Sequence, residues 1–307
     1  MKFSDVLDIR NGRNQRQVEN ENGKYPIYGS GGVMGHATDF ICDAGTVVIG
    51  RKGSINNPIF VDEPFWNVDT AFGLVAHREV LLPKYLFYFC VNFDFERLNT
   101  TVTIPSLTKA NLLQIEINVP DMDEQRRVVS VLDKTCQLID LQQQELHNLD
   151  QLVKSRFIEL FGDPETNPKG WTRQRLDQIC ENLDSRRVPI TSTDRKAGNY
   201  PYYGASGIVD YVEGYIFDED ILLISEDGAN LVMRSTPIAF SVSGKVWVNN
   251  HAHVVRFETK ATQKYIEICF ALTDISGSIT GTAQPKLNQA KLNAMMLSLI
   301  HISEPTR

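Results

Sequence analysis

The chain has 307 residues, of which 42% are hydrophobic and 22% are charged, as is typical of folded proteins with room for two domains. Its formal net charge of −7 excludes a uniformly basic nucleic-acid-binding protein, although this average says nothing about local basic patches. The sequence contains no apolar run of about 18 residues, no signal-peptide pattern and no CxxC pair among its five cysteines. We therefore expect a cytoplasmic protein with free thiols and without a membrane span.

The first part of the chain is repeated in the second. Residues 24–32 read KYPIYGSGG and residues 199–207 read NYPYYGASG. An apolar strand, a polar loop with glycine and a second strand follow each phrase, and they read GTVVIGRKGSINNPIF and DILLISEDGANLVMRSTPIAF. An amphipathic helix and a short element that begins Pro-x-Leu come later in both copies. The repeat predicts a mixed α/β (α+β) fold with two similar domains of short strands and helices, over residues 1–122 and 163–296.

The segment between the copies has a different pattern. Its apolar residues recur in alternating steps of four and three, which is the heptad pattern of a coiled-coil helix. Acidic residues precede it, and Gly162-Asp163-Pro164 ends it. We predict a long coiled-coil-type spacer helix over residues 123–162 that pairs with another helix, and a surface helix lying on one domain is the alternative. The apolar seam consists of Val128, Leu132, Ile139, Leu146, Leu149, Val153 and Leu160.

The last eleven residues, 297–307, depart from the repeat. By comparison with the first copy, a strand and a second long helix should follow Met296, but the chain reads LSLIHISEPTR. This string resembles the translation of a transposase adapter used in sequencing libraries. We therefore expect a non-native tail in place of a second spacer helix, and no function for His301.

Three stretches resemble nucleotide or cofactor loops, and each lacks a feature that the chemistry needs. No helix start follows the glycines at 29–32, Arg51 separates glycine from lysine in the loop at 45–54, and NNPIF at 56–60 lacks the second proline of an adenine methyltransferase loop. His251 and His253 alternate on one face of a strand, which favours a partly buried pair over a metal site. We predict no catalytic residue, cofactor or metal ligand. The alternative is a stand-alone enzyme that binds a nucleotide or S-adenosylmethionine.

The polar loops between the paired strands suit recognition, because their framework repeats while their chemistry differs. Arg and Lys match guanine edges, Asn matches adenine and carboxylates match the cytosine amine. In the first copy the candidate DNA contacts are Arg51, Lys52, Ser54, Asn56 and Asn57, with Arg13 and Arg16 near the start. In the second copy they are Ser225, Glu226, Asp227, Asn230 and Arg234, with Arg186 and Arg187. For any one of them a solvated surface group is the alternative.

Several motifs together resemble one family. They are Tyr-Pro-x-Tyr-Gly-x-x-Gly at 25–32 and 200–207, G-R-x-G-S at 50–54, P-S-L-T-K at 105–109, V-P-x-x-x-E-Q-R at 119–126 and RFxELFGDP at 156–164. With them, the chain resembles the specificity subunits of type I restriction-modification systems over about residues 1–296.

The resemblance implies two target-recognition domains, each reading one half of a split double-stranded DNA site, and spacer helices that pair antiparallel and fix the gap. It also implies a non-catalytic subunit that carries two adenine methyltransferase (modification) subunits and, for cleavage, ATP-driven restriction subunits. A coiled-coil scaffold that binds proteins without DNA is the third alternative.

Overall fold

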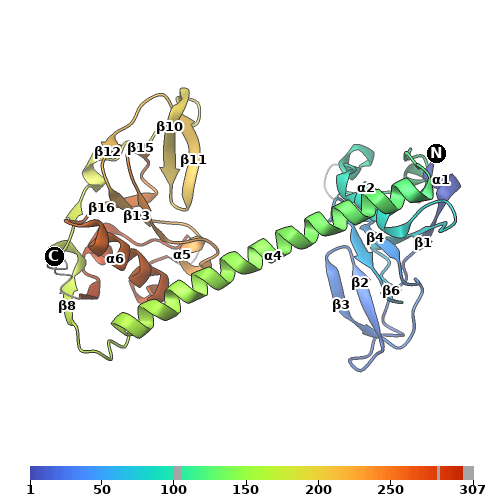
Figure 1. The fold of residues 1–307 in the computed structure, drawn as a ribbon, viewed down its shortest axis with the longest axis horizontal. Coiled ribbons are helices and arrows are strands. Elements are labelled where there is room, and N and C mark those ends of the chain that lie inside the picture. The colour runs from blue at the N-terminus through green and yellow to red at the C-terminus, as the bar shows by residue number, and fades with distance from the viewer. Residues whose placement is uncertain (100–104, 282–283, 300–307) are drawn as a thin grey trace. The chain divides into compact units, whose positions relative to one another are not determined.

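The computed structural model describes residues 1–99, 105–281 and 284–299, and internal contacts divide the chain into two compact units. Unit 1 is Met1–Gln144 and unit 2 is Glu145–Arg307. Each unit combines short, mostly antiparallel strands with a few helices, so the predicted mixed α/β fold is confirmed (Figure 1). The domain boundaries set from the sequence stay a prediction.

Unit 1 contains two sheets. The first has the strand order β1-β7-β4-β5, with every pair antiparallel; its strands are β1 (Leu7–Asn11), β7 (Ala71–Ala76), β4 (Thr46–Gly50) and β5 (Ile59–Val61). The second has the order β3-β2-β6 and consists of β2 (Tyr25–Gly29), β3 (Gly32–Ala37) and β6 (Trp66–Asn67). The helices are α1 (Phe3–Val6), α2 (Pro83–Asn92), a 3-10 turn at Phe95–Leu98 and α3 (Lys109–Leu112).

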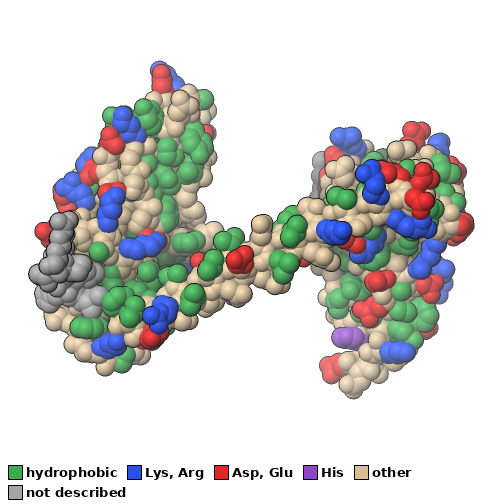
Figure 2. All heavy atoms as spheres, viewed as in Figure 1, with side chains coloured by type: hydrophobic (Ala, Val, Ile, Leu, Met, Phe, Trp, Pro, Cys, Tyr) green, Lys and Arg blue, Asp and Glu red, His purple; other side chains and the backbone are tan. Residues whose placement is uncertain are grey.

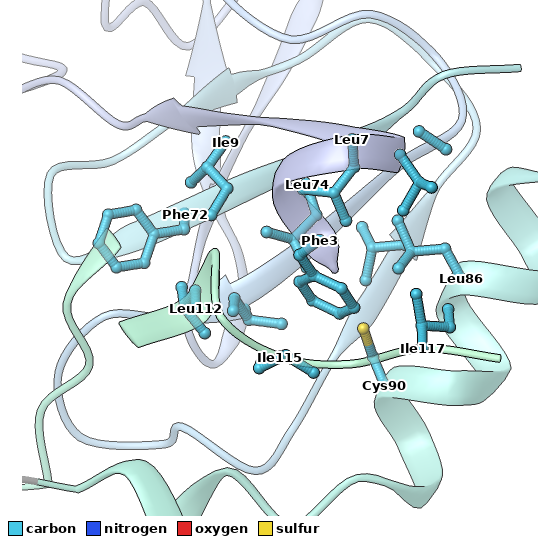
Figure 3. Close-up of a cluster of buried hydrophobic side chains, with 14 of the residues drawn as sticks. Phe3, Leu7, Ile9, Phe72, Leu74, Leu86, Cys90, Leu112, Ile115 and Ile117 are labelled. Atoms are coloured by element: carbon cyan, nitrogen blue, oxygen red, sulfur yellow. The ribbon is translucent and has the colours of Figure 1, made fainter. Parts of the chain in front are cut away.

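The core of unit 1 lies between its first sheet and helix α2. Strand β4 is buried at every residue, as its apolar run VVI requires of a central strand. Figure 3 shows side chains from α1, β1, β7, α2 and the segment after α3 meeting in one cluster, among them Phe3, Leu74, Leu86 and Ile115. Burial of these side chains is the main source of the unit's stability.

Unit 2 repeats this architecture. Its main sheet has the order β14-β13-β16-β9, from Ala239–Val242, Ile221–Ser225, Ala252–Arg256 and Glu181–Asn182. The second sheet has the order β11-β10-β15-β12, from Gly207–Val212, Ala197–Gly204, Lys245–Val248 and Phe217–Asp218. The helices are α5 (Asn230–Met233), α6 (Lys260–Leu272) and α7 (Gln289–Asn293), with 3-10 turns at Leu176–Gln178, Asp184–Arg186 and Ser276–Ser278.

The repeated Tyr-Pro phrase forms equivalent hairpins in the two units. It builds β2 and β10, which pair antiparallel with β3 and β11 and in parallel with the strands that contain Trp66 and Trp247. The glycine shared by both turns has a φ of +120° at Gly32 and +128° at Gly207, a region that favours glycine. The phrase is therefore a strand and its turn, as the repeat predicts, and not a cofactor loop.

Helix α4 runs from Met122 to Phe161 and ends at Gly162, whose φ is +82°. Its first turns pack on unit 1, where the Lys84 ammonium and the Tyr88 hydroxyl both reach Asp133 (2.7 and 2.6 Å). Its last turns pack on unit 2, where Phe157 is 4% exposed and its ring centre lies 5.1 Å from that of Tyr265.

The middle of α4 keeps an apolar stripe at the surface, visible as the green side chains along the helix in Figure 2. Of the seven predicted seam residues, Val128 and Leu132 are half-buried, and the exposed ones are Ile139, Leu146, Leu149, Val153 and Leu160. The alternative of a helix lying along one domain fits poorly, because each end of α4 packs on a different unit. No helix in the described ranges combines the length and apolarity needed to cross a membrane.

The start of the expected non-native tail forms part of unit 2. Strand β17 (Met296–Leu299) pairs antiparallel with β8 (Thr172–Arg175), and the Tyr265 hydroxyl donates to the Ser298 carbonyl (2.8 Å). The isolated bridge between Lys2 and Glu116 occupies the same place in unit 1. The non-native origin of the tail stays a prediction, and residues 300–307, with His301, lie outside the described part of the chain.

Gln125 anchors the start of α4, and its loss should destabilise unit 1. The side chain is fully buried, accepts from the Leu82 N–H (2.9 Å) and donates to the carbonyls of Val80 (2.9 Å) and Pro120 (2.8 Å). Because Gln125→Leu leaves these backbone groups buried without partners, we expect a loss of about 3 kcal/mol in the free energy of unfolding of unit 1.

Urea unfolding, followed by hydrogen exchange of peptides from each unit, measures this loss. Gln144→Leu, an exposed position on the same helix, is the control and should change stability by less than about 0.5 kcal/mol. Equal stability of the two variants would contradict the anchoring role.

Candidate nucleic-acid interface

Three segments converge at one end of each unit: the hairpin turn, the loop after the central strand, and the connection into the next strand. In unit 1 a side chain at Gly50 would meet the Ser54 carbonyl and the Ser30 side chain, and the Arg51 N–H donates to the Thr70 carbonyl (2.8 Å). In unit 2 the Ser225 hydroxyl donates to the Ala205 carbonyl. The Glu226 N–H donates to the His251 carbonyl (2.9 Å), as Arg51 does to Thr70.

A fourth segment, the Pro-x-Leu motif, clamps each loop through its backbone. The Leu107 N–H donates to the Arg51 carbonyl (2.9 Å), and the Gly53 N–H donates to the Pro105 carbonyl (3.1 Å). In unit 2 the Leu287 N–H donates to the Glu226 carbonyl (2.8 Å), and the Gly228 N–H donates to the Pro285 carbonyl (3.0 Å). The backbone of the β4–β5 loop (residues 51–58) is therefore held like that of the β13–β14 loop (residues 226–238).

The β4–β5 loop presents free polar side chains. Arg51, Lys52, Ser54 and Asn57 are exposed, and within the described residues neither Arg51 nor Lys52 forms an ion pair. The Arg51 guanidinium lies 5.8 Å from the centre of the Phe72 ring. These groups can donate hydrogen bonds to phosphates or base edges.

Asn56 differs from its neighbours in the loop because its amide is used within the unit. Its oxygen accepts from the Phe95 N–H (2.7 Å), and its nitrogen donates to the Asp94 carboxylate (3.0 Å), which lowers the pKa of Asp94. Both ends of the amide are therefore engaged, so Asn56 shapes the loop.

Arg13 and Arg16 precede the hairpin and are exposed. The Arg13 N–H donates to the Asn67 carbonyl (2.8 Å), and its carbonyl accepts from the Trp66 ring nitrogen (3.0 Å). The backbone of Arg13 and that of Arg51 therefore bond the same segment, residues 67–70, at Asn67 and at Thr70.

Several candidates in the second copy are engaged inside unit 2. Ser225 is fully buried. The Asn230 amide nitrogen donates to the Thr236 carbonyl, and the Asn230 amide oxygen accepts from the Thr236 N–H (3.0 Å each). Arg234 has a φ of +52° and donates to the carbonyls of Phe270 (2.8 Å) and Thr273 (2.9 Å) at the end of α6. Burial lowers the pKa of Arg234. Asn230 therefore shapes the loop from within, and Arg234 holds it on α6.

Arg186 is also engaged within unit 2. It pairs with Glu219 (2.7 Å), donates to the Ile216 carbonyl (3.2 Å) and covers the Phe217 ring at 4.6 Å. A side chain with this many internal partners has little freedom to reach DNA.

Arg187 and Glu226 belong to a charged network beneath the β13–β14 loop. They pair with each other (2.6 Å), and their side chains are only 14% and 12% exposed. The same network contains Asp184, which lies 2.6 Å from the His253 ring, and Lys286, which lies 3.0 Å from the other Glu226 oxygen. Sequence reasoning placed Arg187 and Glu226 among the DNA contacts, and the structure pairs them beneath the loop.

Two side chains beside this network are half-exposed, His251 and Lys286. The Asp227 carboxylate, 17% exposed, pairs with the His251 ring (2.9 Å). His251 and His253, expected as one partly buried pair, are separated: His251 is exposed, while His253 in β16 is 1% exposed. The alternation His-Ala-His signalled a strand, but no local pattern indicated which carboxylate each ring would meet.

The carboxylates of the network have shifted pKa values. Burial alone would raise the pKa of Asp184, but hydrogen bonds from His253 and the Val254 N–H, with the Arg187 charge, outweigh it and lower the pKa. Burial is likewise outweighed at Glu226, whose pKa is lowered by Arg187 and Lys286. Both groups are therefore ionised at neutral pH.

These lowered pKa values make the stability of unit 2 sensitive to acid. A carboxylate with a depressed pKa stabilises the fold above its unfolded pKa of about 4, and this contribution is lost as the pH falls through the folded value. We expect the free energy of unfolding of unit 2 to fall as the pH drops below about 5, and Asp184→Asn to flatten that slope. Asp218→Asn, an exposed carboxylate in the same unit, is the control. Equal slopes for wild type and Asp184→Asn would refute this assignment.

The chain matches a known protein family and several known proteins in sequence. A family model described as the type I restriction modification DNA specificity domain matches residues 1–151 and 168–304. A Haemophilus influenzae protein that carries the name type I restriction enzyme specificity subunit is 34% identical over 131 residues, which are 43% of this chain and 34% of that protein. The MjaIX specificity subunit of Methanocaldococcus jannaschii is 22% identical over 277 residues, 78% of this chain and 62% of its own length.

A solved structure has the same fold. The crystal structure of a type I restriction-modification system S subunit from M. genitalium superimposes with a TM-score of 0.61 at 16% identity, covering 97% of this chain and 83% of that one. The two curated relatives are matched over less than two thirds of their own lengths. Because the family model covers most of both units, the chain belongs to the type I restriction modification DNA specificity domain family.

Proposed function

We propose that the chain recognises a bipartite DNA sequence, with each unit reading one half. The observation that carries this proposal is the pair of loops that share one backbone clamp but present opposite chemistry. The β4–β5 loop offers Arg51 and Lys52, whereas the β13–β14 loop offers Asp227 beside His251. A frame shared by the two units, with different side chains on it, suits the reading of two different short sequences.

In unit 1 we propose that Arg51 and Lys52 contact guanine edges or phosphates, with Ser54 and Asn57 beside them. The side chains of Arg13 and Arg16 would add contacts to the DNA phosphates of the same half-site. Exposure of all these side chains supports their access to DNA.

In unit 2 we propose that Asp227 accepts from a cytosine amine, with His251 and Lys286 at its flanks. Glu226, Arg187, Ser225, Asn230, Arg234 and Arg186 would support the loop through the contacts described above. A carboxylate that reads cytosine needs no basic surface of its own, because phosphate contacts can come from elsewhere in a complex.

We further propose that the chain is a non-catalytic recognition subunit that acts in the cytoplasm and binds type I modification subunits, two per complex, and restriction subunits. Relatives named specificity subunits support this role. A second spacer helix would cover the exposed seam of α4, since an apolar stripe of this length on one helix is stable in water mainly when paired.

The proposed function is tested by selecting duplexes from a random library with the chain and type I modification subunits. The expected result is a consensus of two short halves with a fixed gap. Titration of the chain with S-adenosylmethionine and ATP tests the alternative of a stand-alone enzyme. Binding of either ligand would support that alternative. A complex that assembles but enriches no sequence would favour a protein scaffold without DNA recognition.

The two basic loop residues should act on one half of the site. We expect Arg51→Ala to weaken DNA binding by about 10-fold or more and relax base preference in the first half only, because a bidentate base contact is worth about 1–3 kcal/mol. If Lys52 binds a phosphate, Lys52→Ala should weaken all sites alike and reduce the salt slope by about 1. Lys134→Ala, an exposed lysine on α4, is the control. A changed preference in the second half would contradict this assignment.

The seam residues should matter for assembly and not for folding. Leu146 is 65% exposed and Leu149 is 50% exposed, so Leu146→Glu with Leu149→Glu should change the stability of each unit by less than about 0.5 kcal/mol per site. In a chain extended by a relative's second spacer helix, the same pair should prevent helix pairing, measured by size-exclusion chromatography with the modification subunits. Gln144→Glu on the opposite face of α4 is the control. Normal assembly of the chain that carries Leu146→Glu and Leu149→Glu would refute the role of the seam in helix pairing.

A further inference from the structure

The first residue of each loop lies close to a buried ring, and both the loop residue and the ring differ between the two units. Gly50 pairs with Ala71, and Ser225 pairs with Ala252, so the residues one step further along each strand are equivalent. Arg51 and Phe72 in unit 1 therefore correspond to Glu226 and His253 in unit 2.

The two pairs satisfy their charges in different ways. In unit 1 the Arg51 cation lies over an aromatic ring, 5.8 Å from its centre, where the ring's electron-rich face attracts it. In unit 2 the Glu226 carboxylate lies 3.7 Å from a ring nitrogen of His253. An aromatic face would not attract a carboxylate, and a protonated imidazole would repel a guanidinium.

The His253 ring lies between two hydrogen-bond acceptors. One nitrogen lies 2.6 Å from the Asp184 carboxylate and the other lies 2.7 Å from the Leu287 carbonyl. A carbonyl and an ionised carboxylate only accept hydrogen bonds, so the ring forms both bonds only when each nitrogen carries a proton, as in an imidazolium. The charged groups that face it are Asp184, Arg187, Glu226 and Lys286, with the Asp227–His251 pair at the surface.

This ring connects two of the segments that hold the β13–β14 loop. Through Leu287 it contacts the segment whose N–H binds the Glu226 carbonyl, and through Asp184 it contacts the turn that leads to Arg187. Arg187 then fixes one Glu226 oxygen, and Lys286 fixes the other. The position of Asp227, the next residue, follows from that of Glu226.

We propose that this ring position, His253 in unit 2 and Phe72 in unit 1, is a specificity-determining positioning residue that matches each loop to the charge of its first side chain. The proposal rests on DNA recognition by the loops. It assigns to a buried residue, out of reach of DNA, control over which bases its loop selects.

Reciprocal exchange of the two rings tests this proposal. His253→Phe and Phe72→His are matched variants, each placing in one unit the ring of the other, and duplex selection with the full chain and modification subunits reads both halves of the site. We expect His253→Phe to weaken binding by about 10- to 100-fold and to change base preference in the second half alone. Phe72→His should do the same in the first half alone.

A conservative variant separates positioning from folding. The amide nitrogen of Gln can still donate to the Leu287 carbonyl, so His253→Gln should recover part of the second-half preference that His253→Phe loses. Nitrogen NMR of histidine-labelled chain should show both ring nitrogens of His253 protonated at neutral pH.

The outcomes distinguish this proposal from DNA recognition itself. No enriched sequence with the wild-type chain overturns the proposed function and this inference with it. A two-part consensus that His253→Phe leaves unchanged, or alters equally in both halves, overturns only the positioning role. A neutral His253 ring removes the charge matching on which the proposal depends.

Discussion

The interface of each unit depends on hydrogen bonds between a loop and a Pro-x-Leu segment, whose leucine lies 56 residues further along the chain in unit 1 and 61 in unit 2. The Leu107 and Leu287 N–H groups donate to the carbonyls of Arg51 and Glu226, the first residues of the two loops. Only backbone atoms take part, so the bond forms whichever side chain the loop residue carries. Because a buried backbone group without a partner costs about 1–3 kcal/mol, the clamp fixes the loop path firmly.

A clamp made of backbone leaves the side chains free to diverge, and they have diverged in sets. Where unit 1 has an arginine above a phenylalanine, unit 2 has a glutamate above a histidine, with Asp184, Arg187 and Lys286 added around them. A buried charge is tolerated only when its neighbours pair with it, so such positions change together. The two units thus keep one fold with different buried chemistry.

The sequence predicted the fold well and the interface only in part. The glycines at positive φ and the heptad of α4 are local signals, which a single sequence carries in full. The partners of Arg234 lie 36 and 39 residues away, and Arg187 meets Glu226 across 39 residues. No spacing rule reveals such pairs, so side chains that are engaged inside unit 2 were predicted from the sequence to be free for contact with DNA.

The pairing of the first and last segments of each unit has a consequence for synthesis. In unit 1 the terminal amine of Met1 bonds the Ile117 carbonyl, and in unit 2 β8 pairs with β17 at residues 296–299. A chain emerging from the ribosome can therefore close unit 1 as soon as the start of α4 follows it. Unit 2 closes only after Leu299 is made, and until then the edge of β8 and the rings around Tyr265 stay open to chaperones and to other chains.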